Sequence, residues 1–325
     1  MKKLALIMTG MLLMTGCFNG ASENSDEEYP SGLIEFVAPA SPGGGWDLTA
    51  RSMQRTLNDN DLVQEDINVI NKPAGGGEVG WKYLQSNDSH TLALNSSLLF
   101  TNNMLGLSEM SYEDFTPLAI LATEWQAIAV GNNSEFDDAE GVMKQLKDDP
   151  TSLKIGVAPG LGNDDHLSFI RAAQSYGVDV SQLDFLVYES GGEVVTALLG
   201  DHIDAAAMSV SEASEQYKAG RLKMVAVSSD ERLEELPEVP TFEEEGIDIV
   251  FPHWRGIMGP PDMTEEEIAY WDERFQTMIE SEDWAQILEN NQWDDYYMDS
   301  EETAEFMKEQ EKVYNDLLTN SGLVE

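Results

Sequence analysis

Short apolar runs alternate with amphipathic stretches along most of this chain, and many of the apolar runs end in a glycine-rich or small-residue turn. Such runs are typical of strands buried on both faces of a parallel sheet, and the stretches between them are typical of crossover helices. The alternation therefore predicts an α/β fold built from βαβ units. The expected strands are residues 33–38, 67–70, 91–94, 153–158, 185–188, 203–208 and 222–228. The expected helices are residues 47–57, 78–84, 139–147, 165–176, 193–199, 284–288 and 303–318.

The remaining segments divide this pattern into two series. Residues 118–130 are apolar with many small side chains, which predicts one or two strands that cross between two lobes. Thr264 and Glu267 form a capping box, so we expect a further helix to open there. Lobe 1 is expected to consist of residues 32–128 and 230–325, and lobe 2 of residues 129–229.

Two glycine-rich turns, residues 40–47 and 71–77, each lie where an expected strand gives way to an expected helix. Glycine lets the backbone approach a ligand closely, because no Cβ atom stands in the way. A helix that begins at such a turn also directs unpaired N–H groups and its positive dipole end to the same place. The two turns therefore predict a site that binds an anion through the backbone.

The N-terminal segment reads as an export signal. Basic residues 2–3 precede a short apolar stretch, and the one cysteine of the chain, Cys17, follows two small residues at its end. This resembles a bacterial lipobox, so we expect residues 1–16 to be a lipoprotein signal peptide and Cys17 to carry lipid. An ordinary signal peptide with a chance cysteine is the alternative. Polar, acidic residues 17–31 are expected to form a flexible tether on the extracytoplasmic face of the cell membrane.

The charge balance excludes one class of partner. The chain has 61 acidic against 18 basic residues, a formal net charge of -43. Nucleic acid is excluded as a partner, because phosphate binding needs clustered Lys and Arg. The acidic residues are spread along the chain, which is typical of a solvated surface. We favour a saline or alkaline habitat over a cationic ligand as the cause, because salt screens such a surface.

Catalytic and cofactor motifs are weak. Residues 75–80 match GxGxxG, but Lys72 and Pro73 separate them from the strand, so we predict no nucleotide cofactor. With its one cysteine in the lipobox, the chain has no Cys–His nucleophile. Asp164, Asp165 and His166 could be metal ligands of a lipid-anchored hydrolase, which we keep as an alternative. We prefer the interpretation that the chain is not an enzyme and holds no metal ion at these residues. In this interpretation the two Asp residues cap a helix, and His166 lies on the first turn of that helix.

Three residues near the first turn have open roles. Asp47 is either a polar ligand of the anion or the N-cap of the first helix, and these roles are compatible. Trp46 either forms a wall of the pocket or packs on the edge of the sheet. Arg51 is expected to pair with Asp47 or a neighbouring acid, and not to contact the anion.

Motifs along the whole mature chain resemble the solute receptors of tripartite tricarboxylate transporters, the TctC or Bug-type family. The matching segments are residues 37–47 with 50–51, 71–77, 160–162 with 166–167, 190–192 with 197–200, 226–232, 239–242, 254–256 and 260–261. This resemblance implies a two-lobed periplasmic-binding-protein fold of type II character with the ligand between the lobes. It also implies a monomer that closes on a small organic carboxylate and delivers it to a permease of a large and a small membrane subunit. A sensor that passes a signal to a membrane partner is a further alternative.

The resemblance implies that one carboxylate is held by backbone amides and waters around the first turn, and that lobe 2 closes over it. The implied ligand-binding residues are Ser41, Gly43, Gly44, Asp47, Gly75, Gly76, Gly162, His166, Gly191 and Gly192. Trp46 and Asn163 are expected to contact the far end of the ligand. Strand-end placement adds Ser96, Tyr188 and Ser209. The chain departs from the family pattern at Trp46 and at residues 163–165, so the identity of the carboxylate stays open.

Overall fold

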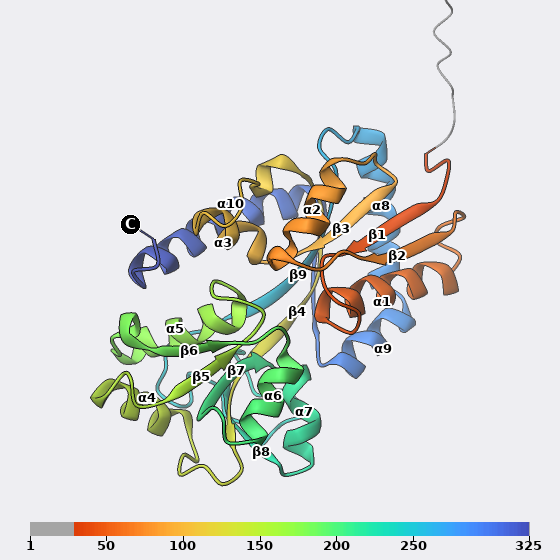
Figure 1. Ribbon diagram of the computed structural model, residues 1–325. Coiled ribbons are helices and arrows are strands. Elements are labelled where there is room, and N and C mark those ends of the chain that lie inside the picture. The colour runs from red at the N-terminus through yellow and green to blue at the C-terminus, as the bar shows by residue number, and fades with distance from the viewer. Residues whose placement is uncertain (1–28, 325) are drawn as a thin grey trace, which may run out of the picture.

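The computed structural model describes residues 29–324 (Figure 1). The expected signal peptide and Cys17 lie outside the described residues. No helix between residues 29 and 324 is both long and apolar enough to cross a bilayer. The fold is α/β and two-lobed, as expected, and its strands form a curled 10-stranded sheet with helices on its faces (Figure 1).

The first βαβ series builds lobe 1 around three parallel strands in the order β2-β1-β3. The predicted elements are all present, with bounds that differ by a few residues at most. They are β1 (Ile34–Ala38), α1 (Gly45–Asp59), β2 (Ile67–Asn71), α2 (Glu78–Gln85) and β3 (Thr91–Asn95). A short helix after β3, α3 (Leu98–Met104), was not predicted.

A single long strand, β4 (Thr116–Gly131), connects the lobes. Its first part pairs with β9 (Pro252–Gly259) in register Thr123 with Trp254, and its last part pairs with β7 in register Ala127 with Met208. The choice between one and two strands is thereby decided in favour of one. The expected lobe boundary at residue 128 stays a prediction, and β4 runs through it without a break.

The second βαβ series builds lobe 2. Its strands follow the order β4-β7-β5-β6, and β8 also pairs with β4. The predicted elements are again present: α4 (Ala139–Asp148), β5 (Lys154–Val157), α5 (Asp164–Tyr176), β6 (Asp184–Val187), α6 (Gly191–Leu199), β7 (Ala205–Ser209) and β8 (Leu222–Val227). One helix between β7 and β8, α7 (Val210–Lys218), was not predicted.

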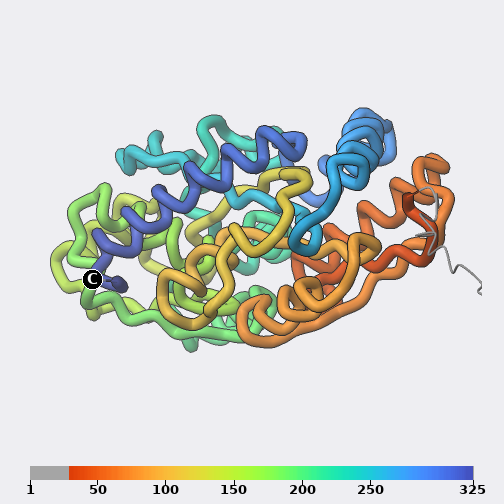
Figure 2. Tube along the Cα trace, turned by 90° about the horizontal axis from the view of Figure 1, so that it is seen from above, coloured from red at the N-terminus to blue at the C-terminus, as the bar shows by residue number. Residues whose placement is uncertain are grey.

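The C-terminal part returns to lobe 1. It contains the predicted helices α8 (Glu265–Ile279), α9 (Glu282–Asn291) and α10 (Ser300–Asn320), and the capping box of α8 is present at Thr264. Two strands were missed: β9, which carries polar side chains and two glycines, and the acidic β10 (Asp294–Met298), which pairs with β4. In both ribbon and trace, α10 runs from lobe 1 toward the side of lobe 2 (Figures 1 and 2).

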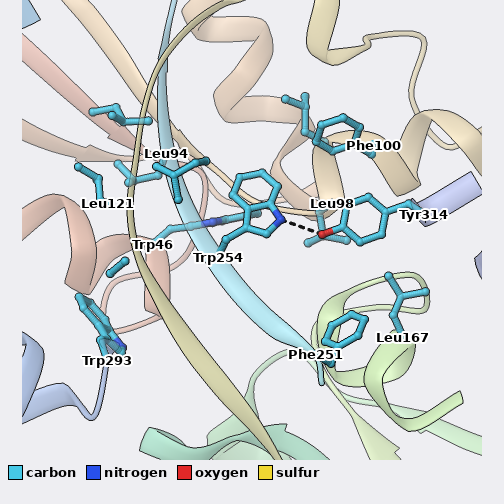
Figure 3. Close-up of a cluster of buried hydrophobic side chains, with 14 of the residues drawn as sticks. Trp46, Leu94, Leu98, Phe100, Leu121, Leu167, Phe251, Trp254, Trp293 and Tyr314 are labelled. Atoms are coloured by element: carbon cyan, nitrogen blue, oxygen red, sulfur yellow. Dashed lines mark hydrogen bonds between the residues drawn. The ribbon is translucent and has the colours of Figure 1, made fainter. Parts of the chain in front are cut away.

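Large aromatic side chains fill the core of lobe 1 around Trp254 (Figure 3). The indole Nε1 of Trp254 donates a 2.7 Å hydrogen bond to the hydroxyl of Tyr314 on α10, and both side chains are buried. This bond fixes α10 against β9, because neither polar atom could find water there.

Replacement of Tyr314 by Phe should lower the free energy of unfolding by about 1–3 kcal/mol, since it leaves the buried Trp254 N–H without an acceptor. Urea denaturation measures this loss. Tyr176→Phe is the matched control, because the Tyr176 hydroxyl is bound to an exposed carboxylate, that of Glu140. A loss for Tyr314→Phe no larger than for the control would contradict the assigned bond.

Candidate functional site

The first glycine turn ends at α1, whose N-cap is Gly44. The Gly43 N–H donates to the Asp47 carboxylate at 2.8 Å, and the Gly44 N–H donates to the Ser41 carbonyl at 3.1 Å. Within residues 29–324, no acceptor is present for the backbone N–H groups of Gly45, Trp46 and Asp47. The free donors are therefore in the first turn of α1, just after the two glycines that the sequence suggested.

Asp47 joins the two glycine turns. Its carboxylate accepts from Arg51 Nε at 3.1 Å and from Asn71 Nδ2 at 2.8 Å, and Asn71 also donates to the Ala40 carbonyl at 3.1 Å. Burial raises the pKa of Asp47, but the hydrogen bonds from Arg51, Gly43 and Asn71 outweigh burial and lower it. The N-cap alternative for Asp47 is wrong, because α1 begins two residues earlier. The expected pairing with Arg51 is confirmed at 2.9 Å.

Arg255, on β9, lies directly against this turn. A Cβ atom on Gly45 would be 2.5 Å from Nη1 of Arg255, so no other residue fits at position 45 without displacing the guanidinium. Arg255 is buried, lies over the Trp293 ring at 5.0 Å, and binds the buried carboxylate of Glu124 through Nη2. Burial lowers the pKa of Arg255 to about 10, which leaves it charged at neutral pH.

The second glycine turn is formed by backbone that only glycine adopts readily. Gly75, Gly76 and Gly77 have φ of 64°, 61° and 107°. The amide of Asn102, on α3, donates to the carbonyl of Gly76 at 3.1 Å and holds the turn. Trp46 packs edge-on against Trp81 of α2 at 5.8 Å, and its expected role in the pocket stays a prediction.

In lobe 2, α5 begins at Asp164 and its N-cap is Asn163, whose side chain accepts from the His166 N–H at 3.1 Å. The expectation that the Asp residues cap this helix is therefore wrong. The His166 ring packs on Phe185 at 4.5 Å, and its Nδ1 accepts from the Gly162 N–H at 3.0 Å. Burial lowers the pKa of His166 to about 4, so the ring is neutral at pH 7.

The lobes touch around the start of α5. His253 Nε2, on β9, lies 3.3 Å from Oδ2 of Asp164. A Cβ atom on Gly162 would be 2.7 Å from the side chain of Leu105, which follows α3. This face of lobe 2 therefore packs on lobe 1 beside β9.

Two further helices of lobe 2 begin near this face. α6 opens with Gly191 and Gly192, and a Cβ atom on Gly191 would overlap the carboxylate of Glu212 in the first turn of α7. The Glu212 side chain is nevertheless exposed to solvent. Desolvation by the surrounding protein raises its pKa, and the hydrogen bond from Ser209 and the charge of His253 offset only part of that effect.

The other expected residues lie at strand ends, as their sequence positions suggested. Ser96 is buried after β3, Tyr188 follows β6 and packs on an apolar cluster that includes Val194 and Met208, and Ser209 is the N-cap of α7. All the expected binding residues stay predictions.

Three charged residues of this region were missed. Arg255 lies against Gly45 and binds Glu124, and Glu212 lies against Gly191, but no role could be assigned to any of the three from the sequence. The available signal was Arg255 itself, a rare cation inside the apolar run 254–259. Among the described residues no group of three or more His, Cys, Asp or Glu side chains is arranged to hold a metal ion.

Two lobes joined by a long shared strand, with free helix N–H groups beside the junction, define a solute-binding receptor. The model of the tripartite tricarboxylate transporter family receptor, TctC, matches residues 49–323. The chain belongs to this family, whose members are receptors and not enzymes.

Relatives and solved structures agree with this assignment. Protein BugT of Bordetella pertussis is 27% identical over 266 residues, 78% of this chain and 79% of the relative. A TctC solute-binding protein from Polaromonas is 25% identical, with a TM-score of 0.71 over 90% of this chain and 99% of its own. Rhodopseudomonas palustris Rpa4515 with adipate is 18% identical, with a TM-score of 0.81 over 91% of this chain and 99% of its own. MatC from the same organism, with bound malate, is 19% identical, with a TM-score of 0.77 over 89% of this chain and 100% of its own. The last two show likeness of fold alone.

Proposed function

We propose that this chain captures a small organic carboxylate between its lobes and delivers it to the membrane permease of a tripartite tricarboxylate-type transporter. The observation that carries the proposal is the set of free N–H groups of Gly45, Trp46 and Asp47 in the first turn of α1. A helix N-terminus favours an anion, because its unpaired donors and its dipole act on the same point.

The surroundings of these donors support an anion. Arg255 lies against Gly45 and is paired with Glu124, and Arg51 is paired with Asp47, so the carboxylates of Glu124 and Asp47 are both neutralised. The malate and adipate bound to MatC and Rpa4515 are small carboxylates, which favours the same class of ligand here.

Stabilisation by ligand tests this proposal. In high salt, a carboxylate at a hundredfold excess over its Kd should raise the free energy of unfolding by roughly 2.7 kcal/mol, because it binds only the folded state. Thermal-shift measurements over a panel of small carboxylates detect this gain. If no carboxylate stabilises the protein, the proposal fails.

A matched pair of glycine variants locates the site. Gly45→Ala should remove the stabilisation by ligand, because its Cβ displaces Arg255 beside the free N–H groups. Gly32→Ala has open space around its Cβ and should keep the stabilisation. Melting temperatures without ligand separate loss of binding from loss of folding. Equal responses of the two variants would place the ligand elsewhere.

The anchor and the partners are part of the same proposal. Lipid on Cys17 would hold the receptor, as a monomer, on the extracytoplasmic face of the membrane beside the two permease subunits. Cys17→Ser should release the protein from the membrane fraction and abolish labelling with a radioactive fatty acid. Retention of the label in this variant would exclude the anchor at Cys17.

A further inference from the structure

The first turn of α5, in lobe 2, is covered by lobe 1. Gly162, just before this helix, has no room for a Cβ atom beside the side chain of Leu105. Leu167 of α5 lies in the same buried apolar cluster as Leu98 and Tyr314 of lobe 1 (Figure 3). We call this arrangement of the lobes closed. Separation of the lobes would expose to water the groups that lie at this contact.

One carboxylate, that of Asp164, is buried at the contact. Its side chain is only 1% exposed, and Nε2 of His253 on β9 lies 3.3 Å from its Oδ2. The hydroxyl of Ser97, the N-cap of α3, lies beside the same carboxylate. Burial and the charge of Asp164 raise the pKa of Tyr314, so α10 is also close to it. Lobe 1 therefore supplies these neighbours of Asp164, and the carboxylate loses them when the lobes separate.

These neighbours do not fully offset the cost of burying the carboxylate. A buried charge is stabilised by its partner only when the geometry is excellent and further hydrogen bonds satisfy it. The distance to His253 is longer than the roughly 2.7–2.9 Å of a charge-assisted hydrogen bond. Burial raises the pKa of Asp164, and the charge of His253 and the hydroxyl of Ser97 offset only part of that rise. The ionised form is therefore less stable in the closed arrangement than in water.

We propose that Asp164 opposes closure of the lobes and so keeps the receptor mostly open until a ligand binds. This inference rests on the proposed function, in which the lobes close on a carboxylate, but it does not depend on which carboxylate is bound. Contacts between the ligand and both lobes would offset the cost of burying Asp164. Asp164 is then a positioning residue, because it acts on lobe 2 and not on the ligand. It should also lower the apparent affinity, since part of the binding free energy is used to close the lobes.

Asp165, the next residue, provides an internal comparison. It is also buried in the first turn of α5, but its neighbours belong to lobe 2. Its Oδ2 accepts from the Ala158 N–H at 3.3 Å, and the charge of Glu212 raises its pKa in addition to burial. Separation of the lobes leaves these neighbours in place. Removal of the charge should therefore change the balance between open and closed lobes at Asp164 and not at Asp165.

Distances between the lobes test this inference without any ligand. Gln85→Cys on α2 and Gln145→Cys on α4 place spin labels at exposed positions of the two lobes (Figure 1). The mature chain with Cys17→Ser has no other cysteine. Pulsed electron paramagnetic resonance should then give mainly the longer, open distance. Asp164→Asn should raise the ratio of closed to open molecules about tenfold, because an amide has no charge to desolvate. Asp165→Asn is the matched control and should leave the ratio unchanged.

Affinity gives a second measurement, with malate and adipate as probes. Either probe that binds the parent protein should bind Asp164→Asn about tenfold more tightly and Asp165→Asn equally well. Damage to the fold would not produce such a gain. An unchanged or smaller closed fraction in Asp164→Asn would overturn the inference, and so would equal shifts in the two variants. If no small carboxylate binds, the proposed function fails, and the distances alone decide whether Asp164 opposes closure.

Discussion

Arg255→Met should cost about 3–5 kcal/mol of unfolding free energy, because it leaves the carboxylate of Glu124 buried without its cation. Taking two charges out of water is tolerated only while each has the other as a partner. Ser211 gives Glu124 a single hydroxyl donor, which cannot replace a guanidinium. Urea denaturation at neutral pH measures the loss, and the melting temperature should fall by about 10 °C.

Two comparisons isolate this effect. The double variant Glu124→Gln with Arg255→Met removes both charges and should recover most of the loss, because no buried charge is then left unpaired. Arg232→Met breaks the exposed pair of Arg232 with Glu244 and should cost no more than about 1 kcal/mol. A double variant no more stable than Arg255→Met alone would mean that packing on Trp293, and not charge pairing, explains the loss.

Between pH 7 and pH 4, His166 should destabilise the protein by about 3 kcal/mol. Its pKa falls from 6.5 when unfolded to about 4 in the folded, buried site, so the unfolded state binds more protons in this window. The free energy of unfolding therefore decreases as pH falls from about 6.5 to 4. The buried carboxyls Asp164 and Asp165 act in the opposite sense, because their raised pKa values favour proton binding in the folded state.

His166→Gln separates these contributions. Its amide can still accept from the Gly162 N–H, but it does not titrate. The stability difference between the protein and this variant should change by about 3 kcal/mol in favour of the variant between pH 7 and pH 4. His202→Gln, at an exposed position of the same lobe, serves as the control. A difference that stays constant with pH would show that His166 is not buried in its neutral form.

Much of the fold could be predicted because apolar periodicity is local. The strands of both βαβ series and the helices between them follow from runs of buried residues, and the α8 capping box follows from Thr264 and Glu267. The missed elements lack such a signal. β9 carries His253 and Arg255, whose burial depends on partners from β4 and α5, and β10 begins with two acidic residues at the edge of β4.

The candidate site also has features that could be predicted from the sequence and features that could not. The glycine turns were visible in the sequence, but the residues that cap the helices were not. Gly44 proved to be the N-cap of α1, and Asn163 proved to be the N-cap of α5. A cap is fixed by the φ and ψ angles where a helix begins, and these depend on the packing of the turn. The ring neighbours of Trp46 and His166, which are Trp81 and Phe185, could not be inferred from the sequence either.

The sequence alone determined the two-lobed α/β class and the family, and it predicted that the glycine turns bind an anion, because strand and helix periods and turn chemistry are properties of neighbouring residues. Only the tertiary structure showed which charges meet. Arg255 binds Glu124, which lies 131 positions away in the chain, because strands β9 and β4 pair side by side. Arg255 also lies against Gly45, which is 210 positions away. Electrostatic energy depends on distance in space and on burial, and neither can be read from the order of the residues.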